Sequence, residues 1–253
     1  MIDFLAGYNL STTSWVLLVT CGILTGMSKT GIQGIGTLVV PIMAFIFGAR
    51  SSTGFLLPML CIADIMAVIY YRHEVKWKYI IKLLPWAIAG FFLAIAVDSR
   101  VPESEFKKLI GLTILLGFII MFWNEKRSKK NTGLPQGYWF PVLFGILGGF
   151  STMIGNAAGP VMAVYLLAAK LPKNAFVGTS AWFFLMVNYL KLPLQYFVWH
   201  NITTSSVLLN VALIPAIFAG AIIGILFVRS VSENNYRNFV TVVTILSALL
   251  LFL

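Results

Sequence analysis

Charged residues, histidine and cysteine are all scarce in this sequence. Only 10% of its 253 residues are charged, whereas a soluble globular domain carries about 25%. With two histidines and two cysteines in total, the chain has little material for a metal cluster or a disulfide framework. It also lacks the Gly-x-x-x-x-Gly-Lys-Ser/Thr phosphate loop and the His-Glu-x-x-His zinc motif. We therefore expect no enzyme, no metal, no cofactor and no pump that carries its own ATP site.

Hydrophobic residues are abundant instead, at 59% of the chain. Apolar runs close to the roughly 20 residues that cross a bilayer recur along the whole length. This pattern predicts an all-α integral membrane protein, multi-pass, with no room for a soluble domain. We expect ten apolar segments, five in each half, at residues 12–27, 35–47, 53–71, 80–97, 106–123, 138–153, 157–169, 176–198, 206–228 and 236–253.

The two halves of the sequence repeat one another at an offset that grows from 123 to 130 residues. Because each half holds an odd number of segments, we expect two inverted repeats: 1–123, a linker at 124–137, and 138–253. Equivalent positions are Gly22 and Gly145, Gly26 and Gly149, Ser28 and Ser151, Gly36 and Gly159, Asp64 and Asn188, Pro85 and Pro215, and Gly90 and Gly220.

Lysine and arginine give the chain a net charge of +10 and collect in alternate loops, most densely at residues 126–130. Basic loops stay in the cytoplasm, so we expect a cytoplasmic linker at 124–137 and both termini outside, in the bacterial inner membrane. Charges spread over short loops indicate orientation and no nucleic-acid partner. The N-terminus has no basic stretch, and we expect no cleavable signal peptide.

Segments 12–27 and 35–47, and likewise 138–153 and 157–169, form two short pairs that either span the membrane or re-enter it. A glycine-rich stretch breaks each pair. Glycine permits a helix break and lets a solute approach the backbone, and freed helix N-termini favour an anion. Close helix packing through small residues is the alternative explanation, and it fits Gly22 and Gly26. The residues expected to bind substrate are Ser28, Lys29, Thr30, Gly31, Gln33, Gly34, Ser151, Thr152, Gly155, Asn156, Thr179, Ser180 and Asn188, with Gly36 and Gly159 at the same breaks.

Three ionisable residues in or between apolar segments have alternative explanations. Lys29 either attracts an anion inside the protein or is a cytoplasmic loop lysine. Asp64 is an intramembrane carboxylate, which is a functional hypothesis by default; it either carries a proton or pairs with a lysine. Lys191 fits a lysine whose ammonium reaches the membrane surface. We expect Lys29 to bind the anion and Asp64 to couple transport to a proton.

The glycine-broken segments resemble those of a known family. The stretch from Gly22-Ile-Leu-Thr-Gly26 to Pro41, its repeat from Gly145-Ile-Leu-Gly-Gly149 to Pro160, and Val177-Gly-Thr-Ser180 are similar to the TauE/SafE family of bacterial membrane proteins, the sulfite exporters. The resemblance covers both halves. It implies a carrier of small sulfur-containing anions, such as sulfite or organosulfonates. Relatives often show a tighter glycine cluster, which Gln33 interrupts here, and this leaves the size of the anion open.

We therefore expect a secondary-active transporter, an exporter or exchanger, whose halves rock around a central anion site by alternating access. Its expected partners are a small anion, a proton and membrane lipid. Two other classes stay open on the sequence alone. One is an anion channel, and the other is a membrane enzyme or assembly factor that handles a sulfur compound without transporting it.

Overall fold

The computed structural model describes residues 10–98, 119 and 139–250. Within these residues the secondary structure is helical, with no strand, which confirms the all-α prediction. The elements are α2 Thr12–Thr30, α3 Gly36–Phe47, α4 Ala49–Tyr71, α5 Trp77–Asp98, α7 Trp139–Gly155, α8 Gly159–Ala168, α9 Lys173–Pro193, the π-helix η1 Leu194–Val198, α10 Thr204–Ala212, α11 Ile214–Ser230 and α12 Glu233–Leu250.

The described helices follow the predicted apolar segments, with one difference. Segment 206–228 is two helices, α10 and α11, bent by 54° around Leu213. Pro215 in the first turn of α11 explains this break, because proline starts a helix readily but cannot continue one. The predicted segment 106–123 lies outside the described residues except at Ile119, and the linker 124–137 lies wholly outside them.

Three of the described helical stretches are long and apolar enough to cross a bilayer, namely α4, α5, and α9 together with η1. The bent α10–α11 pair adds a fourth if it counts as one span. α3, α7 and α8 are apolar but shorter. These lengths and compositions fit a multi-pass membrane protein.

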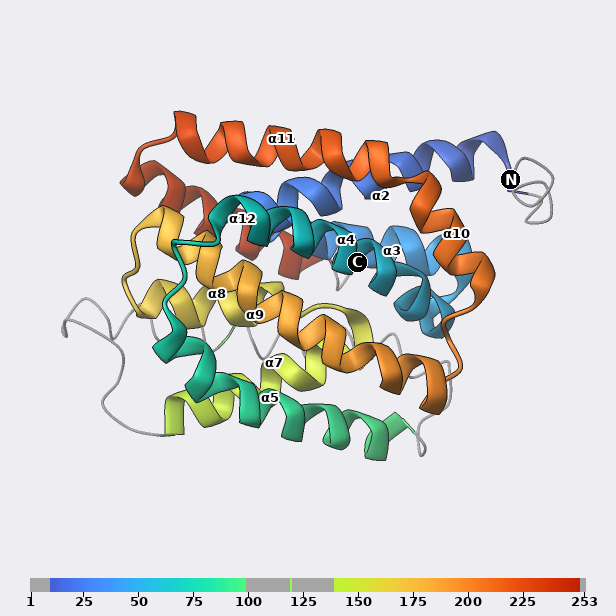
Figure 1. Cartoon of the computed structure of the whole chain (residues 1–253), viewed down its shortest axis with the longest axis horizontal. Coiled ribbons are helices and arrows are strands. Elements are labelled where there is room, and N and C mark those ends of the chain that lie inside the picture. The colour runs from blue at the N-terminus through green and yellow to red at the C-terminus, as the bar shows by residue number, and fades with distance from the viewer. Residues whose placement is uncertain (1–9, 99–118, 120–138, 251–253) are drawn as a thin grey trace.

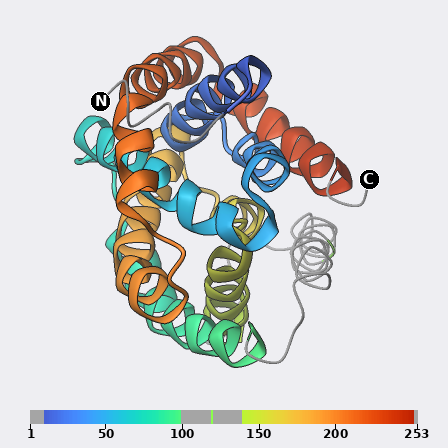
Figure 2. The same cartoon turned by 90° about the vertical axis from the view of Figure 1, so that its right-hand side faces the viewer.

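Helices from the two halves are interleaved. α2 packs along α11 at one side of the molecule, and α5 packs along α7 at the opposite side (Figures 1 and 2). A Cβ added at Gly26 would overlap the carbonyl oxygen of Ile217, and one added at Gly149 would overlap that of Ala87. Gly26 and Gly149 are equivalent positions of the two halves. The first helix of each predicted half thus packs against the fourth segment of the other.

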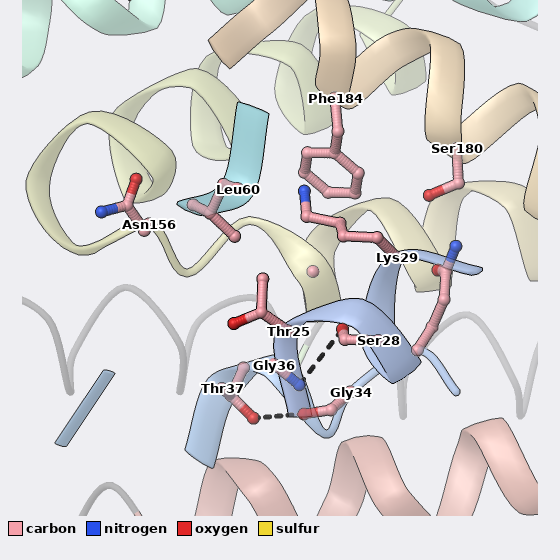
Figure 3. Close-up of a pocket in the computed structure, with 12 residues that line it drawn as sticks. Thr25, Ser28, Lys29, Gly34, Gly36, Thr37, Leu60, Asn156, Ser180 and Phe184 are labelled. Carbon is pink, nitrogen blue, oxygen red and sulfur yellow. Dashed lines mark hydrogen bonds between the residues drawn. The ribbon is translucent and has the colours of Figure 1, made fainter. Parts of the chain in front are cut away.

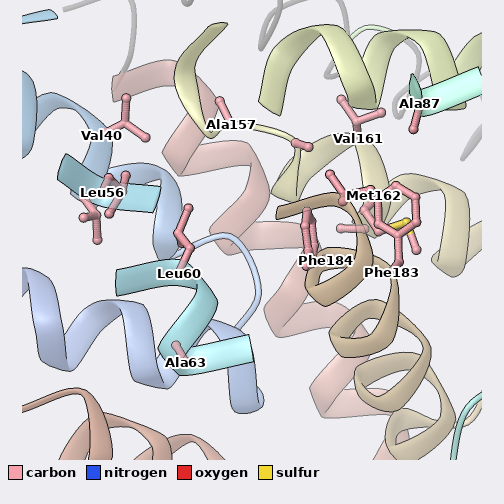
Figure 4. Packing of buried hydrophobic residues seen from close by; sticks show 14 of the residues in the cluster. Val40, Leu56, Leu60, Ala63, Ala87, Ala157, Val161, Met162, Phe183 and Phe184 are labelled. Carbon is pink, nitrogen blue, oxygen red and sulfur yellow. The ribbon is translucent and has the colours of Figure 1, made fainter. Parts of the chain in front are cut away.

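α4 and α9 lie between these two helix pairs and contact each other (Figure 2). Buried apolar side chains from several helices fill the centre, among them Leu56, Val161 and Phe183 (Figure 4). Nearly every side chain of α8 is buried, as expected of a short apolar helix enclosed by others. The interior that surrounds the two glycine-rich breaks is therefore apolar, and polar groups within it stand out.

Candidate functional site

The two predicted breaks are present and separate short helices. Residues 31–35 join α2 to α3, and residues 156–158 join α7 to α8. Gly34 has a φ of 101° and Asn156 a φ of 55°, a left-handed region that glycine adopts freely and asparagine tolerates. These two residues let the chain turn sharply where each helix ends.

A cavity of about 40 Å³ lies between the two breaks (Figure 3). A single buried water needs only about 10–15 Å³, so the cavity has room for a ligand larger than one water. Its lining residues come from both halves of the chain: Thr25, Ser28, Lys29, Gln33, Gly34, Gly36, Thr37, Leu60, Asn156, Gly159, Ser180 and Phe184.

The first residues of two helices face this cavity. Gly36 begins α3 and Gly159 begins α8, and both line it. N–H groups at a helix start have no partner within the helix and carry partial positive charge. The Gly36 N–H donates to Ser28 Oγ at 3.2 Å (Figure 3). A Cβ added at Gly159 would meet no atom within 4 Å, so the start of α8 is open to the cavity.

Lys29 supplies a positive charge at the cavity. It lies in the last turn of α2 with its side chain 10% exposed, and its ammonium is 2.9 Å from Asp64 Oδ1. The ammonium also lies 4.0 Å from the centre of the Phe184 ring, a cation–π geometry. Asp64 on α4 is fully buried, and its other oxygen accepts a hydrogen bond from Asn188 Nδ2 at 2.5 Å. Lys29 therefore lies inside the protein, paired with Asp64, and not in an exposed loop.

Two polar atoms at the cavity have no hydrogen-bond partner among the described residues. They are Gln33 Oε1 and Ser180 Oγ, on side chains that are 5% and 1% exposed. A buried polar group without a hydrogen bond is costly. Because both residues line the cavity, a polar ligand there would satisfy them.

The structure brings six of the predicted substrate residues to the cavity: Ser28, Lys29, Gln33, Gly34, Asn156 and Ser180. Two others hold charged groups behind it, since Thr152 accepts from Lys191 and Asn188 donates to Asp64. The remaining five do not line the cavity: Thr30, Gly31, Ser151, Gly155 and Thr179.

The contacts of these five residues are those of helix packing. The Thr30 hydroxyl reaches backbone carbonyls of α2 and α11, each at 2.9 Å. The Gly31 carbonyl accepts from a tyrosine of α12 at 2.7 Å, and the Ser151 hydroxyl donates to a carbonyl within α7. Thr179 Oγ1 accepts from a backbone N–H just before α5 at 2.9 Å, and Gly155 is buried at the end of α7.

Four further side chains line the cavity and were not expected from the sequence: Thr25, Thr37, Leu60 and Phe184. Three of them lie one helical turn, four residues, from Lys29, Asp64 or Ser180. Residues four apart share one face of a helix, so this spacing is the signal that could have found them. Thr37 directly follows the predicted Gly36.

Lys191 is buried, and its interpretation as a membrane-surface lysine is wrong. Its side chain is 0% exposed. The ammonium donates to the carbonyl oxygen and the hydroxyl of Thr152, at 3.0 and 3.1 Å, and to Asn156 Oδ1 at 2.5 Å. These acceptors lie at the C-terminal end of α7, where partial negative charge gathers, which explains why the ammonium stays inside.

Metal-binding groups do not gather within the part of the chain that the structure describes. No set of three or more His, Cys, Asp or Glu side chains there could hold a metal ion. Cys21 and Cys61 are buried free thiols. The chemical resources of the cavity are therefore cationic, hydroxyl, amide and helix N-terminal groups, which suit an oxyanion.

Comparison with known proteins finds one match. The model of a family described as "Sulfite exporter TauE/SafE" matches residues 17–251, nearly the whole chain. No curated protein and no solved structure gives a significant match. The matched range contains both breaks, the cavity and the buried charges.

Proposed function

The chain belongs to the sulfite exporter TauE/SafE family, and we propose that it is a secondary-active exporter or exchanger of small sulfur-containing anions such as sulfite or organosulfonates. The family is one of membrane transporters with small anionic substrates. That membership is consistent with the expectation that the chain is not an enzyme.

The convergence of two helix N-termini and one ammonium on a small cavity carries this proposal. α3 and α8 both begin at the cavity, and Lys29 reaches it from α2. The Lys29 ammonium and the Gly159 N–H can donate to one oxyanion. The start of α3 adds partial positive charge, while its own first N–H groups donate to Ser28, Gly34 and Ile35. The orphan hydroxyl of Ser180 offers a further donor at the same place.

Alternating access is the proposed transport mechanism. The cavity is lined by residues of both halves of the chain, from 25–60 in the first and from 156–184 in the second. A site at the boundary of two repeats can open to either side when the repeats rock against one another. The predicted inverted orientation of the repeats, the cytoplasmic linker and the inner-membrane location belong to this proposal.

Asp64 is the proposed proton carrier. Its carboxylate faces the Lys29 ammonium at 2.9 Å, so the carboxylate and a substrate anion compete for the same positive charge. A proton on Asp64 removes the negative charge that Lys29 faces and frees the ammonium for the substrate. Proton and anion binding then favour one another, which is a coupling between two ligands of one protein.

Sulfite is the smallest of the proposed substrates, one sulfur with three oxygens. Cationic, hydroxyl and amide groups that line the cavity can donate to all of its oxygens. We propose sulfite as the first substrate to test.

Counterflow in liposomes tests the proposal. Purified protein is reconstituted, the vesicles are loaded with unlabelled sulfite, and the entry rate of labelled sulfite is measured. A carrier shows saturable uptake that internal sulfite accelerates, whereas a channel shows no such acceleration. The Lys29→Ala variant is expected to lose counterflow, and Lys82→Ala, which removes an exposed lysine of α5, is the matched control.

Three results would contradict the proposal. Uptake that internal anion does not accelerate indicates an anion channel. Counterflow that is unchanged in Lys29→Ala would show that the cavity does not bind the transported anion. No uptake of sulfite, sulfoacetate or taurine, together with no stabilisation of the folded protein by any of them, indicates an activity other than transport of sulfur anions.

A further inference from the structure

Lys191 is a buried cation that has no acidic partner among the described residues. The three hydrogen bonds of its ammonium go to two oxygens of Thr152 and to Asn156 Oδ1, all of them uncharged. An ammonium has three donors, so its hydrogen bonding is complete while its charge is unbalanced. Burying an unbalanced charge is expensive, and proteins pair buried charges or use them.

The charges around the cavity do not cancel. Lys29 and Asp64 form an ion pair at 2.9 Å, and Lys191 lies within electrostatic reach of both of them. The Cys61 thiol and the Tyr189 hydroxyl are the other titratable groups that face this cluster. When Lys191 is protonated, two ammonium groups and one carboxylate give the cluster one net positive charge. In a medium of low dielectric, such an excess charge acts over a longer range than it does in water.

Asn156 connects Lys191 to the ligand space. Its side-chain oxygen accepts from the Lys191 ammonium at 2.5 Å, and its side-chain nitrogen donates to the Thr53 carbonyl at 2.9 Å. Asn156 itself lines the cavity, whereas Lys191 is not among the lining residues. Lys191 therefore contacts the cavity only through Asn156. It can act on a ligand by fixing the position of Asn156 and by its own charge.

We propose that Lys191 is a positioning residue that fixes the valence of the transported anion. With Asp64 ionised, the cluster balances one negative charge and accepts a monoanion. A dianion enters only when Asp64 takes up one proton from the water on the side from which the anion comes, because two ammonium groups then face two negative charges. No bond other than the O–H bond of Asp64 forms or breaks, and the proton leaves with the anion. This inference rests on the proposed function.

Binding of two matched sulfur oxyanions tests it. Methanesulfonate is a monoanion and sulfate a dianion throughout the neutral pH range. Calorimetry at several pH values would give the affinity of each anion for the purified protein. For each pH unit lowered, sulfate binding is expected to strengthen about tenfold more than methanesulfonate binding, the difference that one coupled proton on Asp64 makes.

Variants that change the charge of the cluster distinguish a charge role of Lys191 from a purely structural one. A structural role would leave the preference between the two anions unchanged. In Asp64→Asn no carboxylate offsets the lysine ammonium groups, so sulfate binding should become stronger and should lose its extra pH dependence relative to methanesulfonate. Lys191→Gln keeps a hydrogen-bond donor but removes the charge, and methanesulfonate binding should weaken about tenfold or more. The double variant Asp64→Asn/Lys191→Gln restores one net positive charge and should regain methanesulfonate binding relative to Lys191→Gln.

The outcomes separate this inference from the proposed function. If the unsubstituted protein binds neither anion, sulfite nor any other sulfur anion, both fail. If it binds anions but Lys191→Gln retains the affinities and the sulfate slope, the valence role of Lys191 is overturned and the transport proposal stands. If Lys191→Gln does not fold, the anion preference of Asp64→Asn decides, because two ammonium groups without a carboxylate should favour sulfate, and a variant that still favours methanesulfonate overturns the charge count that includes Lys191.

Discussion

Asp64 and Asn188, which the sequence pairs at an offset of 124 residues, touch one another, with Asn188 Nδ2 donating to Asp64 Oδ2 at 2.5 Å. The predicted inverted repeats would place such a pair beside a two-fold axis. The two side chains differ only in amide against carboxylate, so the negative charge belongs to one half. This asymmetry places a single titratable acid beside the Lys29 ammonium.

Loss of the Asp64 carboxylate should uncouple transport from protons. In liposomes with an imposed pH gradient, we expect Asp64→Asn to lose most of the gradient-driven sulfite accumulation, because no other described acidic side chain contacts Lys29. The exchanged variant Asp64→Asn/Asn188→Asp has a carboxylate at the adjoining position. It should recover part of the gradient-driven sulfite accumulation. Accumulation in Asp64→Asn equal to that of the unsubstituted protein would exclude Asp64 as the coupling group.

Removal of one member of the Lys29–Asp64 pair should destabilise the protein more than removal of both. Lys29→Met leaves the fully buried Asp64 carboxylate without its countercharge, at a cost of about 3–5 kcal/mol in the free energy of unfolding. The double variant Lys29→Met/Asp64→Asn removes both charges, and its cost should be smaller than the sum of the two single costs. Unfolding in mixed micelles measures all three variants, and additive costs would show that the pair is not coupled.

A methyl group added at Gly159 should fill the cavity without disturbing the fold. A Cβ there meets no atom within 4 Å, and the residue lines the cavity at the start of α8. Gly159→Ala should therefore weaken sulfite binding about tenfold or more, as expected for overpacking of a small site by about 1–3 kcal/mol, while the unfolding temperature stays close to that of the unsubstituted protein.

Gly148→Ala is the matched control for this prediction. Its added Cβ would make one ordinary contact, 3.7 Å from Val161 Cγ1, and Gly148 is not among the cavity-lining residues. Its sulfite affinity should be unchanged. Equal affinities in Gly159→Ala and Gly148→Ala, measured by calorimetry, would contradict the assignment of the cavity as the substrate site.

The interleaved helix pairs should be intolerant of side chains at Gly26 and Gly149. An added Cβ at either residue overlaps backbone of the partner helix, so helices α2 and α11, or α5 and α7, must move apart. We expect Gly26→Ala and Gly149→Ala each to lower the free energy of unfolding by about 1–3 kcal/mol, whereas Gly148→Ala should change it little. Equal free energies of unfolding for Gly149→Ala and Gly148→Ala would show that the two helix backbones can move apart without loss of stability.

The helical class, the positions of most apolar segments and the two glycine-rich breaks could be read from the sequence. These features are local, because apolar length and helix-breaking residues act within about 20 neighbouring residues. Six residues of the cavity were expected from the same local features. The break within segment 206–228 was not, because Pro215 is compatible both with a kink and with the start of a helix.

Tertiary structure alone decided which polar side chains of the breaks face the cavity. Thr30 and Ser28 are two residues apart, yet one bonds between α2 and α11 while the other lines the cavity. The rotation of each helix about its axis determines this, and that rotation is set by the neighbouring helices. Lys191 shows the same dependence, since its burial requires acceptors at the end of α7, which lie 39 and 35 residues away in the chain at Thr152 and Asn156. An apolar pattern determines that a helix is buried in a membrane or a core, but the partners of its polar groups come from distant segments.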